Sequence, residues 1–107
     1  MQQVSAPQLA EWLNDPERPR PLLLDVREPQ EFVTCHIDGS TPMPMNNIPA
    51  RYMDMDRNIE TVVICHHGHR SMQVAMFLER QGFTNVINLT GGIAAWAHQV
   101  ETAMPTY

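Results

Sequence analysis

The chain reads Thr61-Val62-Val63-Ile64-Cys65-His66-His67-Gly68-His69-Arg70-Ser71 near its middle. The first four of these residues are β-branched, and such a run is typical of a strand that is buried on both faces. Residues 70–81 then predict a helix, because Gly82 stands in the usual position just past a helix end. A strand, a short loop and a helix in this order form the building unit of a parallel sheet. Cys65 follows the strand directly, at the edge where such sheets bind ligands.

The rest of the chain repeats this alternation of strand and helix. Residues 22–26 and 86–89 are apolar runs and predict two more buried strands. Residues 39–49 contain three prolines, so they hold at most a short edge strand. The helices expected between the strands cover residues 5–14, 29–32, 47–55 and 92–97, with Ser5 and Asn47 as caps for the first and third. The pattern predicts an α/β fold with a parallel sheet and helices on both faces. At 107 residues the chain is long enough for one such domain.

The charge balance excludes several classes of partner. Twelve acidic residues against seven arginines give a net charge of −5, and lysine is absent. An acidic chain without a basic cluster is a poor match for nucleic acid or an anionic membrane. No apolar run approaches the length of about 18 residues that a membrane span needs, and residues 1–4 show no export signal. We therefore expect a cytoplasmic protein, in which Cys35 and Cys65 are free thiols.

The loop after the central strand suits a reactive thiol. Gly68 allows backbone angles that a side chain would forbid, so the loop can curl and point its N–H groups inward. Inward N–H groups at a helix start bind anions, because they lack helical acceptors and the helix dipole is positive there. Helix N-termini and cationic neighbours such as Arg70 lower the pKa of a cysteine from about 8.5 to roughly 3.5–7.5. The sequence thus predicts that Cys65 is an activated nucleophile rather than a small buried hydrophobe.

Four segments match a known family in the same order. Cys-x-x-Gly-x-Arg-Ser at residues 65–71 resembles the active-site loop of rhodanese-like sulfurtransferases. Residues 25–32 resemble the family's Asp-Val-Arg-Glu segment, residues 36–40 its Gly-His-Ile-x-Gly-Ala segment, and residues 91–96 its Gly-Gly-x-x-x-Trp segment. Each motif is weak alone, but four in order are specific. The resemblance implies one rhodanese-like domain over residues 1–107, with a five-stranded parallel sheet.

The resemblance also implies a reaction. The thiolate of Cys65 would attack the outer sulfur of a donor such as thiosulfate and form a persulfide, and cyanide or a thioredoxin-like dithiol protein would then accept the sulfur. No metal or organic cofactor is implied. The residues expected to bind the donor are those of the loop, namely His66, His67, Gly68, His69, Arg70 and Ser71. The residues expected to support the site are Asp25, Arg27 and His36.

Other functions remain as alternatives. Counted from Cys65 to Arg70, the loop has six residues, a length that in the family goes with sulfur transfer. Related phosphatases and arsenate reductases have one residue more, which widens the loop for a tetrahedral oxyanion. The alternative from another class is a non-catalytic binding module for a metal or a protein partner. Degenerate relatives of that kind usually lose the loop cysteine, which this chain keeps.

Several residues of the loop have more than one interpretation. His66, His67 and His69 are solvated side chains, or a positive rim that attracts the donor, or metal ligands together with Cys65. Arg70 either faces the substrate or turns away to pair with a carboxylate.

The supporting residues are also open to two interpretations each. Asp25 and Arg27 form either a surface pair or a structural pair that shapes the sheet edge. His36 is interpreted as a structural hydrogen-bonding residue rather than a catalytic one. Cys35 is a small buried side chain, or a resolving thiol for Cys65 if the two lie close together.

Overall fold

The computed structural model describes residues 1–107 and contains one parallel sheet of five strands in the order β1-β5-β4-β2-β3. The strands are β1 (Gln2–Val4), β2 (Leu22–Asp25), β3 (Thr41–Pro42), β4 (Thr61–Ile64) and β5 (Val86–Leu89). The sheet confirms the predicted fold class. All four residues of both β4 and β5 are buried, as their apolar sequences predict.

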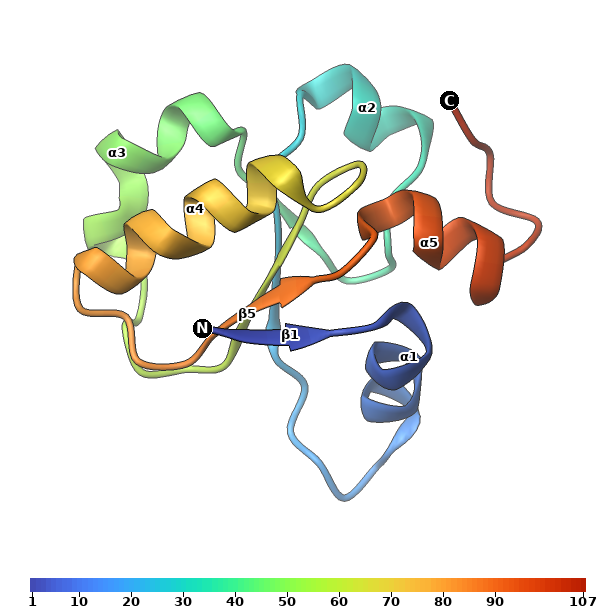
Figure 1. Cartoon of the computed structure of the whole chain (residues 1–107), viewed down its shortest axis with the longest axis horizontal. Coiled ribbons are helices and arrows are strands. Elements are labelled where there is room, and N and C mark those ends of the chain that lie inside the picture. The colour runs from blue at the N-terminus through green and yellow to red at the C-terminus, as the bar shows by residue number, and fades with distance from the viewer.

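Helices cover both faces of the sheet (Figure 1). They are α1 (Ala6–Asn14), α2 (Pro29–Thr34), α3 (Ile48–Arg51), α4 (His69–Arg80) and α5 (Gly92–Gln99). The helices α1 and α5 lie together on one face, while α3 and α4 lie on the other. No helix combines the length and the apolar character needed to cross a membrane.

One local prediction is wrong, and one strand has no signal in the sequence. The helix expected over residues 47–55 is divided into a 3₁₀ turn at Met45–Asn47, the short α3, and a second 3₁₀ turn at Tyr52–Asp54. Asn47 makes no side-chain capping bond, and Ile48 is the one buried residue in this stretch, so little packing supports a continuous helix. The strand β1 was not expected, because an exposed edge strand with two glutamines has no apolar run to reveal it.

Side-chain alternation along the strands divides the interior into two cores. Val62 and Ile64 of β4 face the core under α1 and α5. Val63 and Cys65 face the core under α3 and α4. The alternation therefore directs the Cys65 side chain toward α4, the helix that the loop leads into.

Candidate active site

Cys65 lies directly after β4, at the carboxyl edge of the sheet, and its side chain is 1% exposed. Its Sγ accepts the N–H of Gly68 at 3.0 Å and lies 3.3 Å from the hydroxyl of Ser71. Gly68 has a φ of 105°, in the region that favours glycine, and precedes α4 as its N-cap. The N–H groups of the first turn of α4 have no helical acceptor, and the helix dipole is positive there. The sulfur therefore sits at a place that stabilises negative charge.

The N-terminus of α5 fixes the orientation of the loop backbone. Ile93 donates its N–H to the carbonyl of Cys65 at 2.8 Å, and Ala94 donates to the carbonyl of His66 at 3.0 Å. The C=O and the following N–H of a planar trans peptide point in opposite directions. These two bonds therefore direct the N–H groups of His66 and His67 away from α5.

The approach of α5 to the loop requires glycine at position 92. Gly92 has a φ of 60°, and a Cβ on it would overlap the carbonyl oxygens of Cys65 and His66. The Gly91-Gly92 pair thus lets two backbone segments touch without an intervening side chain.

Arg70 turns away from the loop and pairs with a carboxylate, which resolves the two orientations left open by the sequence. Its Nη1 and Nη2 donate to the two carboxylate oxygens of Glu31, at 2.8 and 3.0 Å. This pairing lowers the pKa of Glu31 to about 2 and raises the pKa of Arg70 above its ordinary value. The pair connects α4 to α2, and the Glu31 carboxylate offsets the positive charge of Arg70 beside the loop.

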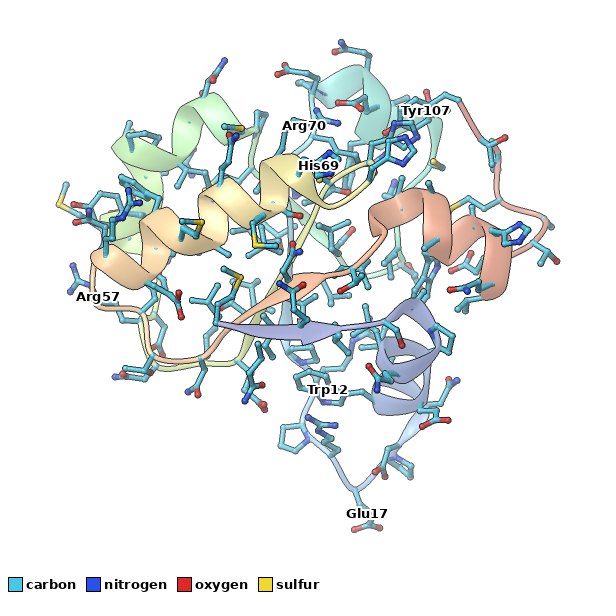
Figure 2. All side chains as sticks on the ribbon, viewed as in Figure 1. Trp12, Glu17, Arg57, His69, Arg70 and Tyr107 are labelled. Carbon is cyan, nitrogen blue, oxygen red and sulfur yellow. The ribbon has the colours of Figure 1, made fainter.

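Tyr107 lies next to this ion pair. In Figure 2, Arg70, His69 and Tyr107 are found at the same end of the molecule, beside α2. The hydroxyl of Tyr107 donates to Glu31 at 2.8 Å and accepts from Arg27 at 2.9 Å. Partial desolvation raises the pKa of Tyr107 to about 12, so its hydroxyl keeps its proton at neutral pH.

The three loop histidines differ in their surroundings. His66 is half-buried and stacks between His67 and Tyr107, with ring centroids 4.0 and 4.2 Å away, whereas His67 and His69 are exposed. Burial, followed by the neighbouring His67, lowers the pKa of His66, so this residue adds no positive charge to a rim at neutral pH. No group of three or more His, Cys, Asp or Glu side chains is placed to hold a metal ion.

Asp25 and Arg27 form a buried pair rather than a surface pair. Their side chains are 1% and 0% exposed, and two nitrogen–oxygen distances of 2.7 and 2.9 Å join them. Arg27 also donates to the carbonyl of Cys35 at 2.7 Å. Burial alone would lower the pKa of Arg27, but the hydrogen bonds that Arg27 donates to Asp25 and Tyr107 raise it. The pair therefore joins the end of β2 to the segment after α2 and makes no hydrogen bond to Cys65.

His36 and Cys35 are not brought to the loop cysteine. His36 is exposed, lies 2.8 Å from the carbonyl of Phe32 through its Nδ1, and stacks on the Phe32 ring. Cys35 packs in the core under α1 and α5, while Cys65 packs in the core under α4. Both thiols are free.

A sequence model of the rhodanese-like domain matches residues 5–99. The chain belongs to the rhodanese-like domain family. It is 40% identical over 76 residues to a sulfurtransferase from Allochromatium vinosum, and this match covers 71% of each chain. It is 35% identical over 77 residues to the thiosulfate sulfurtransferase GlpE of Stutzerimonas stutzeri, covering 72% of this chain and 71% of the relative. These similarities support a role in sulfur transfer.

The fold has solved counterparts in the same family. A rhodanese-related protein from Thermoplasma volcanium superposes with a TM-score of 0.82 at 29% sequence identity, and the match covers 94% of both chains. Other relatives are much longer, since the chain spans 30% and 43% of the length of two of them.

Three residues at the site were not found from the sequence. Glu31 lies in the segment that resembles the family, but nothing in the spacing identifies it as the partner of Arg70 across 39 positions. Tyr107 carries no local signal, because it follows the last helix. Asn88 does carry one, since it is a polar residue inside the apolar run of β5, and it is buried beneath the loop.

Gly92→Ala tests whether α5 holds the loop in place. The added Cβ forces the backbone of Cys65 and His66 away, which breaks two hydrogen bonds, so we expect a loss of about 3 kcal/mol or more in unfolding free energy. Urea unfolding measures this. Gly82→Ala is the matched control, because Gly82 also has a positive φ, but the nearest atom to its added Cβ is the Cδ of Arg57 at 3.8 Å. We expect the control to lose about 1–2 kcal/mol. Equal losses in the two variants would show that close approach at Gly92 is unimportant.

Glu31→Gln tests the pairing with Arg70 through its pH dependence. The pKa of Glu31 is lowered from 4.5 to about 2, so its carboxylate stabilises the fold above pH 4.5, and this contribution is lost as the pH falls through 2. We expect the variant to be less stable at pH 7 by about 1 kcal/mol, because solvent screens a pair in which Arg70 is one-third exposed. The difference from the natural protein should shrink between pH 4.5 and pH 2.

Urea unfolding at a series of pH values measures this difference. Glu11→Gln serves as the control, since Glu11 is exposed on α1 and has no ion pair. A difference between Glu31→Gln and the natural protein that stays constant down to pH 2 would contradict the assignment.

Proposed function

We propose that the protein moves sulfane sulfur from thiosulfate, or a similar small anionic donor, to a thiophilic acceptor through a persulfide on Cys65. The observation that carries the proposal is the placement of the Cys65 sulfur, which accepts the Gly68 N–H at 3.0 Å at the start of α4. The names of two relatives, both sulfurtransferases, support the same chemistry. The alternatives are a non-catalytic binding module and, less favoured by the loop length, a phosphatase or arsenate reductase.

In the first half of the proposed reaction, the Cys65 thiolate attacks the outer sulfur of thiosulfate. A bond forms between the two sulfurs, while the sulfur–sulfur bond of the donor breaks and its electron pair leaves with sulfite. The product is a persulfide anion on Cys65. The total charge is unchanged, because a thiolate and a dianion become a persulfide anion and a dianion.

In the second half, a nucleophile attacks the outer sulfur of the persulfide and restores the Cys65 thiolate. Cyanide would leave as thiocyanate. A dithiol protein of the thioredoxin type would first take the sulfur as its own persulfide, and its second thiol would then displace hydrosulfide and form a disulfide. The reaction needs no metal and no organic cofactor.

In this proposal, the residues around the loop stabilise the negative charge of the persulfide. The outer sulfur of the persulfide would lie one bond beyond Sγ, toward the N–H groups of the first turn of α4. Arg70 makes a smaller contribution, since Glu31 holds its guanidinium to the side and offsets its charge. His67 and His69 are exposed beside the loop, where a donor would approach. Because Cys65 is almost fully buried, a small donor with a protruding sulfur fits better than a bulky one.

Mass spectrometry of the intact protein tests the first half of the reaction. After incubation with thiosulfate we expect the mass to rise by one sulfur atom, and after addition of cyanide we expect it to return to the starting value. Cys65→Ser should abolish the gain. Cys35→Ser is the matched control, because it removes the other buried free thiol and should leave the gain intact.

The same measurement separates the alternatives. A natural protein that gains no sulfur under these conditions would favour the binding module. A mass gain that persists in Cys65→Ser, or that disappears in Cys35→Ser, would show that a residue other than Cys65 carries the sulfur.

A further inference from the structure

Asn88 is a buried polar residue that the proposed reaction leaves without a role. It is the third residue of β5, it is 2% exposed, and its three neighbours in the strand are apolar. Because side chains alternate along a strand, Asn88 faces the same side of the sheet as Val86, under α4. An amide in such a place is costly unless its hydrogen bonds are satisfied.

The partners of Asn88 fix the orientation of its amide. The Nδ2 group lies 3.5 Å from the carbonyl of Gly68 and donates to the side-chain oxygen of Gln3 at 3.0 Å. A backbone carbonyl can only accept a hydrogen bond, so the NH₂ end of Asn88 faces Gly68, and its oxygen faces the opposite way. That oxygen accepts the hydroxyl of Ser71 through a short hydrogen bond.

This bond determines what Ser71 presents to the nucleophile. A serine hydroxyl has a single proton, and in this structure the proton of Ser71 is directed to Asn88. The Ser71 oxygen therefore turns a lone pair toward the Cys65 sulfur, 3.3 Å away, and can accept the thiol proton. Gly68 is then the one residue that donates a hydrogen bond to the sulfur.

We propose that Asn88 is a positioning residue for the Cys65 nucleophile, because it holds the Ser71 proton away from the sulfur. The inference rests on the proposed function only in taking Cys65 as the nucleophile. A thiolate with fewer donors is less stabilised but more nucleophilic, since nucleophilicity rises with basicity with a coefficient of about 0.4–0.5. Asn88 thus makes the Cys65 thiolate attack faster, while it makes the Cys65 thiol harder to ionise.

The charged groups around the sulfur do not depend on Asn88. Arg70 lies on α4 and is held by Glu31 of α2, and His66 stacks on Tyr107. None of these four residues hydrogen-bonds to Ser71 or Asn88. Their electrostatic effect on Cys65 is therefore common to the natural protein and to variants at position 88.

The test is the pH profile of Cys65 alkylation by iodoacetamide, measured in a Cys35→Ser background so that one thiol reacts. In Asn88→Leu, the Ser71 hydroxyl loses its acceptor and donates to the thiolate instead. We expect the midpoint of the profile to fall by about one pH unit, the effect of one charge-assisted hydrogen bond. The rate at high pH should fall about threefold, as the nucleophilicity coefficient requires for that change in basicity.

A double-mutant cycle shows whether Asn88 acts through Ser71. In a Ser71→Ala background, Asn88→Leu should change neither the midpoint nor the high-pH rate. An unchanged profile in a folded Asn88→Leu protein would overturn the proposal, and so would an equal shift in the presence and absence of Ser71. If Asn88→Leu does not fold, Asn88→Val removes the same acceptor with a residue suited to strands.

Thr61→Val controls for a general loss of stability. It removes a hydrogen bond from a buried residue at the opposite end of β4, between the Thr61 hydroxyl and the carbonyl of Ile59. We expect its alkylation profile to match that of the natural protein. Alkylation does not require sulfur transfer. The alkylation profile therefore tests the role of Asn88, while the mass gain after thiosulfate tests the proposed function independently.

Discussion

The structure around the site depends on the direction in which the peptide groups of one loop point. Two N–H groups at the start of α5 bind the carbonyls of Cys65 and His66. The opposite sides of those peptides are then available to face an anion. This arrangement requires two backbones in direct contact, and therefore a glycine at position 92. The parallel sheet brings the two backbones together, because it places the ends of β4 and β5 side by side.

The fold could be predicted from the sequence wherever burial controls local structure. The strands β2, β4 and β5 are mainly apolar because helices cover both faces of the sheet. The sequence also marks the start of α1 with a capping residue and the end of α4 with a glycine. Prediction failed where burial is weak. The strand β1 pairs through its backbone at an exposed edge, and the segment around Ile48 buries one side chain in three short turns.

The site could be predicted only in its local part. The glycine and the helix start near Cys65 are neighbours in the sequence, so their chemistry is visible there. The ion pair of Arg70 with Glu31 and the bonds of Tyr107 join segments that are distant in the chain. Such pairings depend on three-dimensional packing and leave no pattern of spacing. A polar residue in an apolar run, such as Asn88, is the one distant contact that the sequence does signal.

The separation of the two thiols has a consequence under oxidative stress. Cys35 and Cys65 pack in cores on opposite faces of the sheet, so the two thiols do not face each other in this conformation. A sulfenic acid formed on Cys65 by peroxide would have to be reduced by a thiol from another molecule. Under the proposed function, a dithiol acceptor would carry out this reduction in addition to removing sulfur from Cys65.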